Sequence, residues 1–119
     1  MRKYWPQKQY IDNFKNKGAN IVFTEDPFEA VNNATVVATD VWVSMGDDVG
    51  TRNQDFKPYQ VNSEKMVKAN KNAIFLHCLP ALRGKEVTSE VIDGPQSFVF
   101  EEAENRLHIQ KSILSFLII

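Results

Sequence analysis

Short apolar runs alternate along this chain with segments that have the spacing of helices. Four runs predict strands, at residues 19–24 (ANIVFT), 34–43 (ATVVATDVWV), 73–77 (AIFLH) and 97–100 (SFVF). The first three are continuous rather than alternating, which is typical of buried strands in a parallel sheet covered on both faces. The pattern therefore predicts a parallel sheet with helical connections.

Helices are predicted in the segments between these runs. The first starts at Pro6, runs to about Lys17 and is ended by Gly18. The second occupies residues 27–33 and follows Asp26, whose side chain is suited to cap a helix N-terminus.

Three further helices are predicted in the second half of the chain. One occupies residues 62–72, with Asn62 or Ser63 as its N-cap, and a short helix or turn occupies residues 88–95. The longest begins at about Glu101 and has acidic residues in its first turn, where the positive end of the helix dipole favours them.

This order predicts a three-layer α/β fold, with a mostly parallel sheet flanked by helices. Ligands of such sheets bind at the carboxyl ends of the strands. Three segments meet that condition, at residues 39–46, 77–81 and 100–106. Residues 44–60 show little periodicity, and a segment of that length is typical of a functional loop or lid.

Composition adds few constraints on function. The 119 residues suit one domain, and a net charge of −1 gives no reason to expect a nucleic-acid partner. The sequence has one cysteine and neither a dinucleotide fingerprint nor a Walker loop, so no cofactor and no metal are expected. No apolar run approaches the roughly 20 residues of a membrane helix, and a single cysteine suits a reducing cytoplasm.

The one cysteine, Cys78, directly follows the strand predicted at residues 73–77. A buried free cysteine is commonly an apolar filler, whereas at the carboxyl end of a strand its thiol can face a pocket. A neighbouring cation would lower the pKa of that thiol and make it a proton acceptor or nucleophile. His77 precedes it in the strand, so its side chain points the other way and is expected to be packed or hydrogen-bonded.

Asp40 lies inside the apolar run 34–43, where a carboxylate is unfavourable unless it is paired. It is either a structural cap or buried ion pair, or a group that holds a cation such as an amine. Ser44, Met45 and Gly46 open the long loop. They form either a plain turn or a place where backbone N–H groups approach a ligand.

Arg106 follows several acidic residues early in the last predicted helix. The simpler interpretation makes it an exposed i, i+4 partner of Glu102. The alternative is a guanidinium group that binds substrate oxygens in bidentate fashion.

Three segments together resemble ornithine carbamoyltransferases: TDVWVSMG (39–46), FLHCLPA (75–81) and FEEAENRLHIQKSIL (100–114). The segment GANIVFTEDPFEAVNNA (18–34) is similar to the part of that family that precedes the first motif. The resemblance covers essentially the whole chain and implies a Rossmann-like fold. It also implies transfer of a carbamoyl group from carbamoyl phosphate to the δ-amine of L-ornithine, which yields L-citrulline and phosphate in arginine biosynthesis.

The resemblance implies roles for single residues as well. Asp40, Ser44 and Met45 would bind the amino-acid end of ornithine. Cys78 would be the catalytic residue, placed against the δ-amine as its proton acceptor. The same cysteine separates this branch from the similar aspartate carbamoyltransferases, which have a proline at that position.

Carbamoyl phosphate would be bound by Cys78, by the backbone carbonyl of Leu79 and by Arg106. One arginine is not enough for a dianionic phosphate. The family binds the phosphate mainly through a Ser-x-Arg-Thr motif at a helix N-terminus, and this sequence has no such motif. The isolated chain is therefore expected to be inactive.

The resemblance implies that residues 1–119 are the carboxy-terminal ornithine-binding domain of such an enzyme, an incomplete domain without its first strand and without the amino-terminal carbamoyl-phosphate domain. Full-length members are commonly homotrimers that act on small molecules. Two alternatives remain open from the sequence. One is a carbamoyltransferase for a related amine such as putrescine, and the other is a non-catalytic amino-acid-binding or subunit-interaction module.

Overall fold

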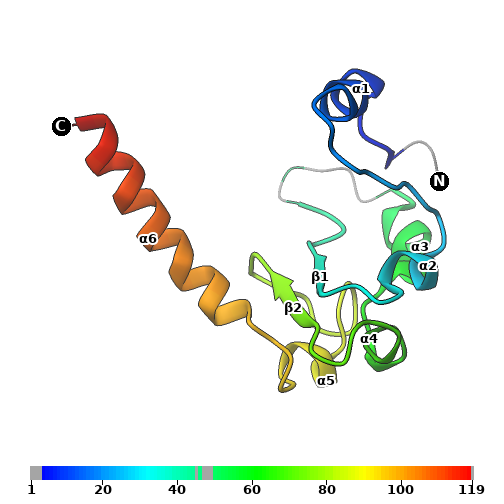
Figure 1. Cartoon of the computed structure of the whole chain (residues 1–119). Helices are drawn as coiled ribbons and strands as arrows, with labels where there is room; N and C mark the ends of the chain where they lie inside the picture. The colour runs from blue at the N-terminus through cyan, green and yellow to red at the C-terminus, as the bar shows by residue number, and fades with distance from the viewer. Residues whose placement is uncertain (1–3, 45, 47–49, 119) are drawn as a thin grey trace.

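A two-stranded parallel sheet lies at the centre of the computed structural model, which describes residues 4–44, 46 and 50–118. The strands are β1 (Val36–Thr39) and β2 (Ile74–His77), and their register pairs Val36 with Ile74 and Thr39 with His77 (Figure 1). Parallel strands need a crossover connection, and here it contains several short helices. The predicted α/β class with a parallel sheet is confirmed.

Six α-helices and one 3-10 helix surround or extend from this sheet in the described residues. They are α1 (Lys8–Asn16), α2 (Pro27–Val31), α3 (Arg52–Phe56), the 3-10 helix η2 (Lys57–Tyr59), α4 (Ser63–Lys68), α5 (Ser89–Ile92) and α6 (Val99–Ile118). Two predicted caps are confirmed. The Asp26 side chain accepts a hydrogen bond from the Phe28 N–H at 2.8 Å, and that of Asn62 accepts one from the Lys65 N–H at 3.1 Å.

The strand predicted at residues 19–24 is wrong. In the part of the chain that the structure describes, this segment has no ladder pairing with β1 or β2, and the Val22 side chain is 76% exposed. Its apolar residues instead make local contacts, such as the stacking of Phe23 on Trp5 at 5.2 Å between ring centroids. A strand is defined by backbone pairing with a neighbour, so an apolar run without one stays irregular.

The last predicted strand is also shorter than expected. Segment 97–100 makes one bridge to β2, between Ser97 and Phe75, flanked by the hydrogen bond from the Phe98 N–H to the Phe75 carbonyl at 2.9 Å. The chain then turns into α6 at Val99 instead of at Glu101. Val99 is buried at this corner, so burial of its side chain replaces further strand pairing.

The predicted loop at residues 44–60 is interrupted by α3 and η2. Thr51, just before α3, donates its hydroxyl to Asp55 at 2.7 Å, and Tyr4 donates its hydroxyl to the same carboxylate at 2.7 Å. These contacts connect the segment to the start of the chain. A functional role for the rest of this loop stays a prediction.

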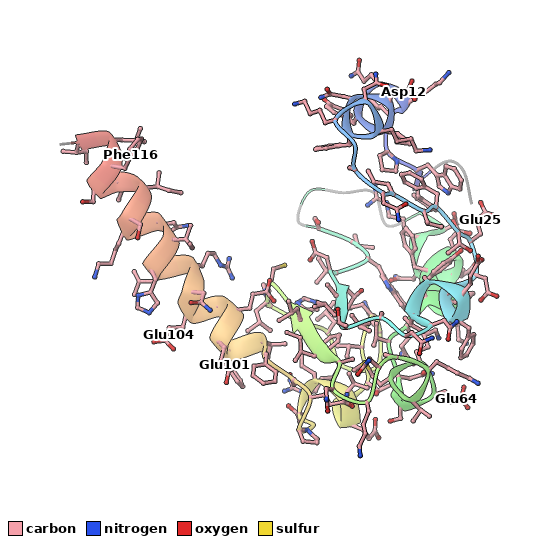
Figure 2. The ribbon with its side chains drawn as sticks, viewed as in Figure 1. Asp12, Glu25, Glu64, Glu101, Glu104 and Phe116 are labelled. Atoms are coloured by element: carbon pink, nitrogen blue, oxygen red, sulfur yellow. The ribbon has the colours of Figure 1, made fainter. Side chains whose placement is uncertain are left out.

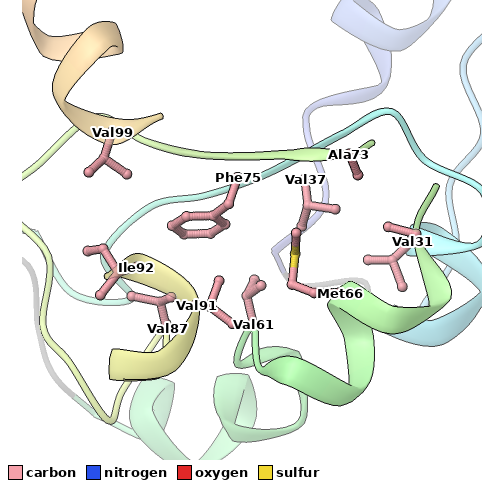
Figure 3. Packing of buried hydrophobic residues seen from close by; sticks show 11 residues of the cluster. Val31, Val37, Val61, Met66, Ala73, Phe75, Val87, Val91, Ile92 and Val99 are labelled. Carbon is pink, nitrogen blue, oxygen red and sulfur yellow. The ribbon is translucent and has the colours of Figure 1, made fainter. Parts of the chain in front are cut away.

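A small core stabilises the fold. Phe75 of β2 is fully buried, and Val37 of β1 packs beside it above α4 and α5 (Figure 3). The buried apolar residues are Val31, Val37, Val61, Met66, Ala69, Ala73, Phe75, Val87, Val91, Ile92 and Val99. The other side of β1 is not covered within the described residues, because Val36 and Ala38 are exposed.

Helices α1 and α6 project from this core (Figures 1 and 2). The radius of gyration is 16.3 Å, whereas a compact chain of this length has about 13.5 Å. Only the start of α6 packs on β2, and Phe116 near its far end is 87% exposed. None of the described helices has the length and apolarity needed to cross a membrane.

Candidate functional site

The carboxyl ends of the two strands bring a carboxylate and the thiol together. Because Thr39 pairs with His77, the following residues, Asp40 and Cys78, emerge side by side from the sheet. The Cys78 thiol donates a hydrogen bond to Asp40 Oδ1 at 3.2 Å. These residues are far apart in sequence, so the parallel register alone creates the pair.

Arg106 reaches the same edge from α6. Its Nη2 donates a hydrogen bond to the Cys78 carbonyl oxygen at 2.5 Å. The simpler sequence interpretation, an exposed partner of Glu102, does not account for this contact. The three segments predicted to meet at the strand ends therefore do meet at Cys78. Segment 100–106 contacts it through Arg106, and segment 39–46 contacts it through Asp40.

A cleft of about 370 Å³ opens at this edge. It is lined by Ala38, Thr39, Asp40, Leu76, His77, Cys78 and Glu102. Sequence reasoning named Glu102 only as an i, i+4 partner of Arg106 and missed its place in the cleft. The available signal was its position one turn before Arg106, on the same helix face.

The thiol is less acidic here than an ordinary cysteine. Partial burial raises the pKa of Cys78, and the hydrogen bond and negative charge of Asp40 raise it further. Glu102 raises this pKa as well, and the positive charge of Arg106 offsets only part of the increase. The expected lowering of this pKa by a neighbouring cation is thus outweighed by burial together with two carboxylates. In this state Cys78 is a neutral hydrogen-bond donor.

His77 points away from the thiol, as strand alternation predicts. Its side chain is fully buried, and its Nδ1 accepts a hydrogen bond from the Leu79 N–H at 2.9 Å. The Nε2 lies 3.3 Å from Glu86 Oε1, whose side chain is also fully buried. The prediction that His77 is packed or hydrogen-bonded rather than paired with Cys78 is confirmed.

Leu79 forms the turn between the strand and Pro80. Its φ is 55°, in the left-handed region that disfavours a leucine, and its peptide bond to Pro80 is cis. The side chain packs against the core from a partly buried position. The turn therefore presents the backbone of Cys78 and Leu79 at the strand edge.

The loop residues predicted to bind ornithine are only partly described. Ser44 is exposed just beyond Asp40, and Met45 lies outside the described residues. Gly46 has a φ of 89°, which glycine adopts without strain. The roles predicted for Ser44 and Met45 stay predictions.

A second cleft, of about 610 Å³, also has Asp40 in its lining, but not Cys78. Its lining is aromatic with one cation, and consists of Tyr4, Trp5, Thr39, Asp40, Val41, Trp42, Arg52, Phe56 and Tyr59. Asp40 thus lies between two hollows. Sequence reasoning missed this aromatic wall, because Tyr4 and Phe56 meet only through the fold, with ring centroids 4.5 Å apart.

Comparison with known proteins assigns a family to this arrangement. Residues 2–117 match the family model for the Asp/Orn binding domain of aspartate/ornithine carbamoyltransferases. The chain is 56% identical over 112 residues to an ornithine carbamoyltransferase of Brucella abortus (strain 2308), covering 93% of this chain and 36% of the relative. It is 60% identical over 112 residues to that of Rhodopseudomonas palustris (strain ATCC BAA-98 / CGA009), with the same coverage of 93% and 36%.

A solved structure gives the same result for the fold. The ornithine carbamoyltransferase from Pyrococcus furiosus superposes with a TM-score of 0.85 at 42% identity, over 96% of this chain and 38% of that one. The chain thus spans about a third of the length of the relatives it matches.

Proposed function

Because this chain belongs to the aspartate/ornithine carbamoyltransferase family, we propose that it forms the ornithine-binding part of an enzyme that carbamoylates L-ornithine. The carbamoyl group comes from carbamoyl phosphate and is transferred to the δ-amine, which gives L-citrulline and phosphate. The domain has the Rossmann-like α/β fold of its structural relatives.

The proposal rests mainly on the contact between Asp40 and Cys78. A carboxylate that lines a cleft suits the α-ammonium group at the amino-acid end of ornithine. The δ-amine must lose a proton before it attacks a carbonyl carbon, and the neighbouring Cys78 is the proposed acceptor. An ammonium group placed beside Asp40 would offset the negative charges that now raise the pKa of the thiol, and would favour the thiolate.

When the substrate ammonium groups bind, the Cys78 thiol first releases its proton to solvent. The δ-ammonium then passes one proton to the resulting thiolate, and the neutral nitrogen attacks the carbonyl carbon of carbamoyl phosphate. A C–N bond forms while the bond between the carbonyl carbon and the bridging oxygen of the phosphate breaks, and the phosphate leaves with the electron pair. The second proton on the nitrogen is lost to the departing phosphate.

Carbamoyl phosphate is proposed to lie along the turn that follows Cys78. The backbone carbonyl of Leu79 would accept a hydrogen bond from the carbamoyl amide. Arg106 uses its Nη2 for the Cys78 carbonyl, and its other guanidinium N–H groups suit substrate oxygens. A dianionic phosphate needs more positive charge, so the proposal places further phosphate-binding groups outside these 119 residues.

The amino-acid end of ornithine is proposed to lie near Asp40, Ser44 and Met45. Arginine biosynthesis, a cytoplasmic location and assembly of the full-length enzyme as a homotrimer are further proposals. They are supported by the likeness to the family and, for the location, by a free thiol in the proposed site.

Acceptor choice tests this proposal. The 119 residues would replace the matching segment of the full-length Brucella abortus relative, and folding would be checked by circular dichroism. Carbamoylation rates would then be compared for ornithine and for putrescine, which lacks the α-carboxylate. We expect ornithine to be the better acceptor by at least about tenfold, since the loop would bind its amino-acid end. Equal rates, or a preference for putrescine, would refute the assignment of ornithine.

A further inference from the structure

We propose that His77 and Glu86 form a positioning pair that holds the turn at residues 78–82, and with it the backbone of Cys78 and Leu79. The pair touches none of the groups proposed to react. It goes beyond the proposed function and depends on it only where turnover is measured.

Both side chains of the pair are fully buried, on the side of β2 away from the thiol. Burial of a carboxylate is unfavourable unless its oxygens are bonded, and a buried ion pair is commonly no more stabilising than two apolar side chains. A contribution to stability alone therefore does not explain why a histidine and a glutamate occupy these positions.

The hydrogen bond to Leu79 determines which ring nitrogen of His77 is the acceptor. The Leu79 N–H donates to His77 Nδ1 at 2.9 Å, so this ring nitrogen is an acceptor and has no proton. The proton of the neutral ring then sits on Nε2, which lies 3.3 Å from Glu86 Oε1. The acceptor role toward Leu79 thus fixes the tautomer, and it places the Nε2 proton beside the Glu86 carboxylate, close to it but without the alignment of a hydrogen bond.

The same carboxylate holds the far side of the turn. Glu86 Oε1 accepts the Leu82 N–H at 2.6 Å, so the oxygen that lies 3.3 Å from His77 Nε2 binds the backbone beyond Pro80. Glu86 is itself anchored, because its carbonyl accepts the Val61 N–H at 2.8 Å and the adjoining Val87 is fully buried.

The turn needs such support. Leu79 has a φ of 55°, which is unfavourable for a side chain branched beyond Cβ unless surrounding contacts impose it. Loss of the His77 contact frees the Leu79 amide to relax. The carbonyl groups of Cys78 and Leu79 would then shift together. Arg106 binds the first of these carbonyls. A displacement of about 1 Å at a reacting centre can lower the rate about a hundredfold.

Amide substitutions test the contacts of the two imidazole nitrogens separately. In His77→Asn the amide oxygen takes the place of Nδ1 and keeps the acceptor for Leu79. In His77→Gln the amide reaches toward Glu86 and the acceptor for Leu79 is lost. Glu86→Gln keeps an acceptor oxygen, whereas Glu86→Leu removes it.

The first test uses the 119-residue chain and requires no turnover. Nitrogen-15 NMR of the imidazole should show a neutral ring with its proton on Nε2. The rate at which iodoacetamide alkylates Cys78 should change by about threefold or more in His77→Gln, and should stay within about twofold in His77→Asn. A ring with its proton on Nδ1, or identical alkylation rates for the two variants, would overturn the proposal.

The second test uses the full-length graft described above. We expect His77→Gln and Glu86→Leu to lower kcat by at least about tenfold with KM for ornithine within about twofold, and His77→Asn and Glu86→Gln to retain most of the rate. Full kcat in a folded His77→Gln graft would contradict the positioning role. If the unsubstituted graft makes no citrulline, the proposed function fails, and the NMR and alkylation results still decide the positioning role.

Discussion

Deletion of the central core side chain should cost far more than the same deletion on α6. Phe75 is 0% exposed between the strands and α5, whereas Phe116 near the end of α6 is 87% exposed. Phe75→Ala removes a buried ring and leaves a cavity, which costs about 3–5 kcal/mol in the free energy of unfolding. Phe116 buries only about an eighth of its surface, so Phe116→Ala should cost less than about 0.5 kcal/mol.

Urea unfolding of the 119-residue chain, followed by circular dichroism at 222 nm, measures both values. The stability of a whole domain is about 5–15 kcal/mol, so Phe75→Ala should lower the midpoint strongly or abolish the transition. Phe75→Leu keeps more apolar volume and should fall between the wild type and Phe75→Ala. If Phe116→Ala costs more than about 2 kcal/mol, α6 is buried in solution against another surface, and the single-core description is refuted.

Three further predictions concern the site, a helix cap and the whole chain. Asp40→Asn removes a charge that raises the pKa of Cys78, so the pH profile of Cys78 alkylation should shift to lower pH, and an unchanged or higher profile would contradict the assigned cause. Asn62→Ala removes the acceptor for the Lys65 N–H and should cost about 1 kcal/mol of unfolding free energy in urea, with the exposed Asn72→Ala as its control. The purified 119-residue chain should produce no citrulline from ornithine and carbamoyl phosphate in a colorimetric assay, and steady production would show that its own residues suffice for phosphate binding.

Local chemistry made several elements predictable from the sequence. Asp26 and Asn62 each bond to an amide two or three residues away, so a short window contains everything that their caps need. The strands at Val36–Thr39 and Ile74–His77 were also identifiable, because β-branched and apolar residues mark them. Strand alternation correctly separated the side chains of His77 and Cys78.

The strands predicted wrongly or too long are those whose formation depends on pairing with a distant segment. Residues 19–24 have the composition of a strand, but a strand also needs a neighbour, and composition does not supply one. Segment 97–100 has a neighbour for one bridge only, after which burial of Val99 starts α6.

The electrostatics of the site were the least predictable feature. The charge state of Cys78 depends on its burial in the fold and on Asp40 and Glu102, which come from two other segments, and Arg106 offsets part of their effect. Likewise, Glu86 sits in an unremarkable polar stretch of the sequence, and only the folded turn brings it to His77. Spacing along the chain does not encode distances of this kind.

Citrulline formation by the full-length graft, with one carboxylate neutralised at a time, tests the central claim most directly. Asp40→Asn changes the residue that contacts Cys78, and Asp93→Asn makes the same chemical change at an exposed carboxylate paired with Arg83. We expect Asp93→Asn to retain the rate within about twofold and Asp40→Asn to lower kcat/KM for ornithine by at least about a hundredfold. Equal activity of the two variants would contradict the account that Asp40 and Cys78 form the amine-binding site.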